Sequence, residues 1–134
     1  MSIILAFVLL AIAEGERVSV FPEGNYTLQV SKTEYITLDW ESTVPTVIYL
    51  AANCSTRDKA RSSGLNLTQL MYNFFRFSPS SDPEYLKFMG DFKSMTDCVV
   101  KPDENDLYYV RLGEDPKKSL MVYFAGKIRT LVHE

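Results

Sequence analysis

The stretch Tyr26–Trp40, which reads YTLQVSKTEYITLDW, carries the spacing of apolar residues that decides the fold class. In Tyr26–Val30, and again in Ile36–Trp40, apolar and polar side chains alternate with a period of two. This alternation is typical of a strand with one buried face. The polar segment Ser31–Glu34 separates the two runs. The stretch therefore predicts an antiparallel β-hairpin.

Further runs with strand character follow this hairpin along the chain. Val47–Ala52 is a more continuous apolar run and predicts a third strand. Later runs rich in β-forming residues are Leu107–Leu112, Leu120–Phe124 and Lys127–Val132. The sequence therefore predicts a mainly antiparallel β framework, either sandwich-like or a partly closed sheet.

Between these runs the apolar spacing changes to that of a helix. The positions i, i+3, i+4, i+7 and i+8 are all apolar in one segment, occupied by Leu67, Leu70, Met71, Phe74 and Phe75. This stripe predicts a first helix, although the aromatic residues in it also suit a strand.

A second helix is expected directly afterwards. Ser81 and Glu84 have the spacing of a capping box, and Pro83 lies in the first turn, where its missing N–H costs little. The sequence thus predicts an α+β domain with a helical pair inserted around residues 65–93.

The start of the chain has the composition of an export signal. Ile3–Ala13 is an unbroken apolar run, too short to span a bilayer as a helix, and it ends in the small-x-small triplet Ala11-Ile12-Ala13. We expect residues 1–13 to be a signal peptide and 14–134 to be a single compact, β-rich extracellular domain. The alternative is that residues 1–13 form a buried first strand.

Three of the five asparagines stand in acceptor triplets for N-linked glycosylation. They are Asn25, Asn53 and Asn66. Ordinary Ser and Thr usage gives less than one such match by chance. The enrichment predicts a secreted glycoprotein.

The chain holds two cysteines, Cys54 and Cys98, which is the number needed for one disulfide in an oxidising compartment. Because Cys54 is the middle residue of the Asn53 triplet, an early disulfide should hinder glycan transfer to Asn53. Asn25 and Asn66 are therefore the better expected acceptors.

The residue inventory argues against catalysis. The single histidine, His133, is next to last in the given sequence, where we expect the chain to fray, so no Ser-His or Cys-His pair is predicted. Asp39 and Glu41 flank Trp40 and should lie on the solvent face of a strand whose other face is buried. We expect no enzyme activity, no catalytic residues, no metal site and no cofactor.

Aromatic richness points to binding instead. Tyr72 and Arg76 are four residues apart and would share a face of the first helix, while Tyr108 and Tyr109 should point to opposite sides of a strand. Tyr and Arg are favoured at recognition surfaces. These four residues form the predicted binding surface.

The composition also limits the class of partner. The net charge of −3 disfavours nucleic acid, and nothing after residue 13 predicts stable membrane insertion of the mature chain. The favoured function is a non-catalytic recognition module for an extracellular protein.

One resemblance favours an alternative. The stretch FMGDFKSMTDCVVKPDENDLYYVRLGED, Phe88–Asp115, resembles the paired late strands of lipocalin-type barrels in secreted arthropod proteins. The likeness covers about a fifth of the chain, and the Gly-x-Trp that this family usually has early in the sequence is missing. It implies a calycin-like β-barrel and a carrier or scavenger of a small hydrophobic ligand.

Overall fold

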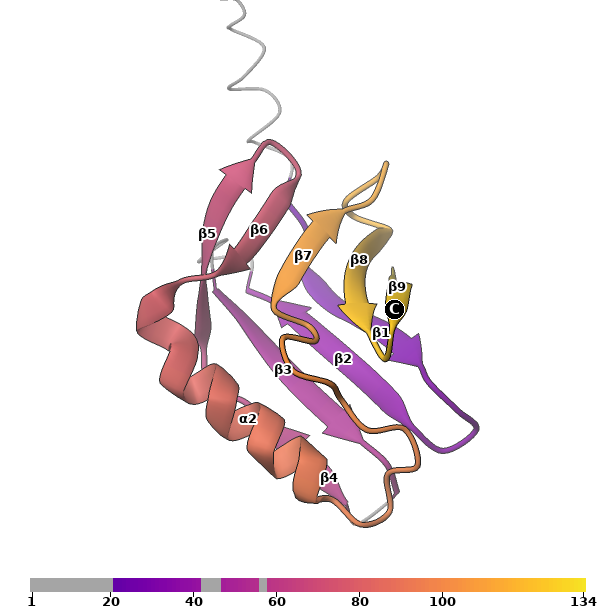
Figure 1. Ribbon diagram of the computed structural model, residues 1–134. Coiled ribbons are helices and arrows are strands. Elements are labelled where there is room, and N and C mark those ends of the chain that lie inside the picture. The colour runs from indigo at the N-terminus through magenta and orange to yellow at the C-terminus, as the bar shows by residue number, and fades with distance from the viewer. Residues whose placement is uncertain (1–20, 42–46, 56–57) are drawn as a thin grey trace, which may run out of the picture.

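The computed structural model describes residues 21–41, 47–55 and 58–134, so the expected signal peptide at residues 1–13 lies outside the described residues. Within the described ranges, nine strands form one antiparallel sheet (Figure 1). In chain order the strands are β1 (Gly24–Gln29), β2 (Tyr35–Trp40), β3 (Val47–Asn53), β4 (Lys59–Arg61), β5 (Leu65–Met71), β6 (Phe74–Phe77), β7 (Tyr109–Leu112), β8 (Ser119–Phe124) and β9 (Lys127–His133).

The sheet closes into an eight-strand barrel, with β4 attached to it through β3. The order runs β2-β1-β9-β8-β7-β6-β5-β3, and an additional pairing of β2 with β3 completes the ring. The last strand reaches the first through the register pairs Tyr26↔His133 and Thr27↔Val132. The expectation of a sandwich is therefore wrong, and the alternative of a calycin-like barrel fits better. The reason is that β9 returns to pair with β1, which joins the two ends of the sheet.

The expected first helix is also wrong, because residues 65–77 form the β5–β6 hairpin. Helical packing would bury Leu70 and Met71, yet their side chains are 45% and 65% exposed. The residues that are buried follow a period of two: Leu65 and Leu67 on β5, Phe75 and Phe77 on β6. Tyr72 and Asn73 make the turn between the strands. The apolar residues of this segment match the spacing of a helix only by chance, and its aromatic residues favour the strand conformation that forms.

The expected second helix is present as α2 (Asp82–Ser94), preceded by the short 3-10 helix η1 (Pro79–Ser81). The predicted capping box does not form. The Ser81 hydroxyl instead accepts the backbone N–H of Asn66, at 2.9 Å, and so joins the helix start to β5. No helix among the described residues is long and apolar enough to cross a membrane.

Aromatic side chains fill the interior of the barrel. Trp40 packs edge-on against Phe75, with ring centroids 5.5 Å apart. The helix α2 runs beside β4 (Figure 1) and sends Tyr85 and Phe92 into the same core. There Phe92 stacks on Phe124 of β8 at 6.0 Å. The barrel and the helix thus share one hydrophobic core.

The predicted disulfide is confirmed: Cys54, at the end of β3, is bonded to Cys98, 44 residues further along the chain. Both cysteines are buried. The segment after Cys98 is also fixed by the buried carboxylate of Glu34, which accepts the backbone N–H groups of Val99 at 3.2 Å and Val100 at 3.0 Å. The stretch that connects α2 to β7 is therefore tied to both β3 and the β1–β2 turn.

A second buried carboxylate organises the region before β7. One oxygen of Asp106 accepts the backbone N–H groups of Asp103 at 2.8 Å and Ala125 at 2.9 Å. Ala125 and Gly126 both have positive φ, 52° and 89°, as in a type I′ turn between β8 and β9. Ala125 and Gly126 thus form a tight hairpin turn, which the Asp106 carboxylate holds.

Tyr85 gives the folded state a dependence on alkaline pH. Its hydroxyl donates to the backbone carbonyl of Asp106 at 2.6 Å. Burial raises the pKa of Tyr85 above the ordinary value of 10.0, and the Asp106 carboxylate adds to the rise. Because the phenol ionises more readily in the unfolded chain, its contribution to stability is present below pH 10.0 and is lost as the pH rises further.

We therefore expect Tyr85→Phe to weaken the alkaline decline of stability. At neutral pH the variant should lose about 1 kcal/mol of unfolding free energy with the hydrogen bond. Above about pH 10 its stability should fall less steeply than that of the wild type, because one buried phenol no longer ionises on unfolding. Urea unfolding of both proteins across this pH range measures the two slopes, and equal slopes would contradict the prediction.

Candidate functional site

The outer face of β6–β9 carries an apolar hollow of about 690 Å³. The strand register brings its residues together, since Phe74 lies opposite Arg111, Arg111 opposite Met121, and Tyr123 opposite Ile128. The lining consists of Phe74, Glu104, Asn105, Tyr109, Arg111, Met121, Val122, Tyr123 and Ile128. We call this surface the aromatic hollow.

Two ring contacts give the aromatic hollow a defined shape. The rings of Phe74 and Tyr109 stack with centroids 5.5 Å apart and an interplanar angle of 6°. The guanidinium of Arg111 lies 5.1 Å from the centroid of Phe74, within cation–π range. Among the described residues, the Arg111 side chain makes no ion pair. The hollow therefore offers an apolar surface that carries the guanidinium of Arg111, outside any ion pair, and the carboxylate of Glu104.

The apolar side chains of this surface are open to solvent. Tyr109 is 40% exposed, Tyr123 50% and Ile128 69%. Scattered apolar residues are normal on a protein surface, but a contiguous group with polar residues around it marks an interaction site. Aromatic residues and arginine are also the types that dominate binding energy at interfaces.

The structure separates the four residues of the predicted binding surface. Tyr109 lines the aromatic hollow, and Arg76 lies opposite it on β6. Tyr72 lies in the β5–β6 turn, so the prediction that Tyr72 and Arg76 share a helix face is wrong. The reason is the strand conformation of this segment.

The expectation that Tyr108 and Tyr109 point to opposite sides of a strand is wrong, because Tyr108 precedes β7 and its ring meets that of Tyr109 edge-on, with centroids 5.3 Å apart. The ring of Tyr108 also packs against Phe77 at 5.6 Å and Tyr85 at 5.1 Å, and its hydroxyl donates to the Asp82 carboxylate at 3.1 Å. Burial raises the pKa of Tyr108, and the hydrogen bond to Asp82 adds to the rise. Tyr108 therefore belongs to the junction between the barrel and α2.

Sequence reasoning missed most of the aromatic hollow. Of the lining, only Tyr109 was predicted as a binding residue; the others are Phe74, Glu104, Asn105, Arg111, Met121, Val122, Tyr123 and Ile128. A signal for two of them is present in β8, where Leu120, Val122 and Phe124 are buried. In a strand with only one buried face, the apolar residues between them, Met121 and Tyr123, must point outward.

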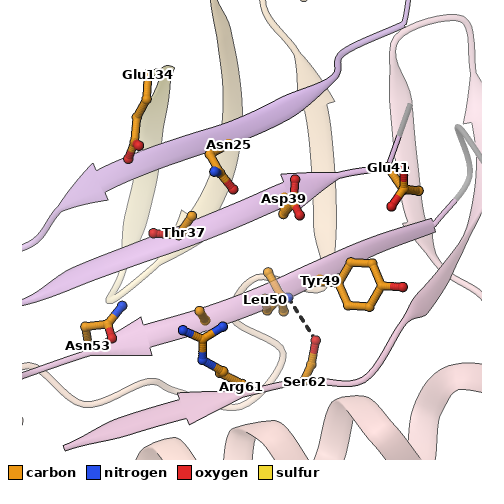
Figure 2. Close-up of a pocket in the computed structure, with 11 residues that line it drawn as sticks. Asn25, Thr37, Asp39, Glu41, Tyr49, Leu50, Asn53, Arg61, Ser62 and Glu134 are labelled. Atoms are coloured by element: carbon orange, nitrogen blue, oxygen red, sulfur yellow. Dashed lines mark hydrogen bonds between the residues drawn. The ribbon is translucent and has the colours of Figure 1, made fainter. Parts of the chain in front are cut away.

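A second, polar hollow of about 540 Å³ lies on the outer face of β1–β4 (Figure 2). Its lining consists of Asn25, Thr37, Asp39, Glu41, Tyr49, Leu50, Ala51, Asn53, Arg61, Ser62 and Glu134. Trp40, the last residue of β2, is buried in the core. Asp39 lies on the outer face, where the alternation of β2 places it, and Glu41, the first residue after β2, also lines the polar hollow.

The three glycosylation triplets lie on β1, β3 and β5. Asn25 and Asn66 are exposed, and Asn53 is partly buried beside the disulfide. Asn25 and Asn53 both line the polar hollow. No triplet lies on β6–β9, where the strands form the aromatic hollow.

His133 is held in β9, so the expectation that this end frays is wrong. Its ring packs edge-on against Tyr26, with centroids 4.9 Å apart, and its Nε2 lies 2.9 Å from the carbonyl oxygen of Glu23. The pairing of β9 with β1 is the physical reason for this order.

Comparisons of this chain with models of known protein families, with curated proteins and with solved structures find no match. The two hollows, and the fold that positions them, are the features of the described residues from which a function can be inferred.

Proposed function

We propose that this chain is a secreted, non-catalytic recognition protein that binds an extracellular protein through the aromatic hollow. The exposed cluster of Phe74, Tyr109, Tyr123 and Arg111 is the observation that carries the proposal. Support for secretion comes from the disulfide, which is typical of oxidising compartments, and from three acceptor triplets on surface strands.

The chemistry of the hollow suggests what its partner presents. Burying Tyr109, Tyr123 and Ile128 requires apolar side chains on the other surface. The unpaired cation of Arg111 favours a carboxylate placed against Phe74 and Arg111. We therefore expect a partner surface on which an acidic side chain is set among apolar ones.

A protein fits this surface better than a small molecule. Pockets for small ligands enclose most of the ligand surface. The lining of the aromatic hollow is itself widely exposed, so a small molecule bound there would remain largely in water. A broad protein surface can cover the whole hollow and exclude water from it.

The second candidate function is a carrier of a small hydrophobic ligand. The closed barrel favours it, because lipocalin-type carriers hold their ligands inside such barrels. The interior of this barrel, however, is occupied by large, fully buried side chains that include Trp40, Phe75 and Phe77. Native mass spectrometry of the purified protein tests this candidate, and a co-purified small molecule would favour it over recognition.

The recognition proposal can be tested with a matched pair of variants. Tyr109 and Tyr49 are 40% and 39% exposed, and both point outward from strands, one in each hollow. Wild type, Tyr109→Asp and Tyr49→Asp would each be immobilised and exposed to the extracellular fluid of the source. We expect one protein from the fluid to bind to immobilised wild type and to Tyr49→Asp but not to Tyr109→Asp.

The affinity of that protein should then fall about 30-fold or more in Tyr109→Asp, the loss typical of a central hot-spot residue. Tyr49→Asp should bind like wild type. Unfolding curves establish that both variants are folded. If the three proteins retain the same set of partners with equal affinity, recognition through the aromatic hollow is wrong.

A further inference from the structure

We infer that the polar hollow of β1–β4 holds the chain's own glycan, attached at Asn25. This inference rests on the part of the proposed function that makes the chain a secreted glycoprotein. The occupant is the first sugars of an N-linked glycan, folded back over β2 and β3 toward β4. The glycan would then be part of the surface of the folded protein.

The position of Asn25 is the first observation behind this inference. Asn25 is exposed on β1, lies opposite Asp39 of β2 in the register, and lines the hollow itself (Figure 2). A sugar bonded to its side-chain nitrogen therefore begins at the rim of the hollow.

The shape of the hollow provides a path for the sugars. Thr37 of β2 and Ala51 of β3 are register partners, and Arg61 of β4 lies opposite Ala51. Thr37 and Ala51, in the middle of the path, have small side chains and leave room above the sheet for sugars. The next outward-facing register pair, Asp39 and Tyr49, lies along one side of the path. From β1 to β4 the path crosses three strand spacings, about 14 Å, which is long enough for the first sugars of a glycan.

The side chains along this path have the chemistry to bind carbohydrate. The Asp39 carboxylate can accept hydrogen bonds from sugar hydroxyls, and the Arg61 guanidinium can donate to sugar oxygens. Within the described part of the chain, neither side chain makes a hydrogen bond or an ion pair. The half-exposed ring of Tyr49 offers an apolar face for the C–H groups of a sugar.

Asn53 also lines the hollow but is the weaker origin for the glycan. It is partly buried, and its triplet contains Cys54, which the disulfide fixes. Asn66 lies on β5, outside the lining of the hollow, and because Asn66 is exposed its glycan provides an internal reference within the same molecule.

The test measures how fast a peptide-N-glycosidase releases each glycan from the native secreted protein. We expect the enzyme to release the glycan at Asn25 about tenfold more slowly than the glycan at Asn66. The reason is that two or three weak contacts between the Asn25 glycan and the polar hollow must break before the enzyme can reach the bond. After reduction and denaturation the two glycans should be released at equal rates. The double variant Tyr49→Ala/Arg61→Ala should raise the native rate at Asn25 to that at Asn66.

A second double variant, Leu86→Ala/Lys87→Ala on the exposed side of α2, serves as the control and should leave both rates unchanged. Equal native rates at the two sites in the wild type would overturn the inference and leave the proposed function standing. A slow native rate at Asn25 that stays equally slow in Tyr49→Ala/Arg61→Ala would likewise overturn the inference and leave the proposed function standing. A product that is exported with neither glycan would overturn the inference together with the glycoprotein part of the proposed function.

Discussion

Replacing Phe77 with alanine is expected to lower the free energy of unfolding by about 3–5 kcal/mol, the range for truncating a buried phenylalanine. Phe77 is fully buried at the end of β6, where the barrel meets α2. Its ring packs against Tyr85 at 5.4 Å and Tyr108 at 5.6 Å. The truncation would leave a cavity between barrel and helix, and a loss of this size is a large part of the stability of a small domain.

The matched control is Tyr72→Ala, an aromatic truncation in the turn of the same hairpin. Because Tyr72 is 53% exposed, its replacement should change the unfolding free energy by less than about 1 kcal/mol. Urea unfolding of both variants, with the disulfide intact, gives the two values. A loss below 1.5 kcal/mol in Phe77→Ala would mean that the junction between α2 and the barrel is not packed as described.

Cys98→Ser is expected to destabilise the fold by roughly 2–5 kcal/mol, the usual effect of losing a native disulfide in a small secreted domain. The disulfide closes the chain between the end of β3 and the segment after α2. Without it, the unfolded chain gains conformational freedom, which favours unfolding. The thermal midpoint of the variant, compared with that of the wild type, measures the effect.

The same variant should also raise glycan occupancy at Asn53. Cys98→Ser leaves the triplet of Asn53, Cys54 and Ser55 intact while it removes the bond that constrains its middle residue. Slower folding would keep the triplet accessible for longer. Peptide mapping of Asn53 in the secreted variant gives the occupancy, and unchanged values of both occupancy and melting midpoint would mean that the disulfide has neither effect.

Local patterns predicted the local parts of the fold well. The alternation in Tyr26–Trp40 led to β1 and β2, and the helix start near Pro83 led to α2. The segment of residues 65–77 failed because its apolar residues satisfy a helical period and a strand period at once. Which period applies is decided by tertiary packing, here the burial of Phe75 and Phe77 in the barrel.

Barrel closure had no local signal. It depends on β9 pairing with β1 from the other end of the chain, through contacts such as Tyr26↔His133. The aromatic hollow could not be predicted from local sequence for the same reason, since Phe74 and Ile128 lie on strands that are far apart in the sequence. Only Tyr109 was named in advance, because exposed tyrosines are favoured at recognition surfaces.

Closure of the barrel also restricts how this chain can meet another protein. Within the described residues, every strand except β4 has a hydrogen-bonded neighbour on both sides, and β4 is three residues long with α2 packed beside it. A partner that adds a strand of its own is therefore confined to the stretches beside the two short seams, where β1 pairs with β9 and β3 with β5 at only two register positions each. Copies of the chain likewise have only these stretches as a template for edge-to-edge stacking into aggregates. A complex that forms elsewhere on the barrel must form through side chains, so that its specificity can be changed by single substitutions on the outer face of the sheet.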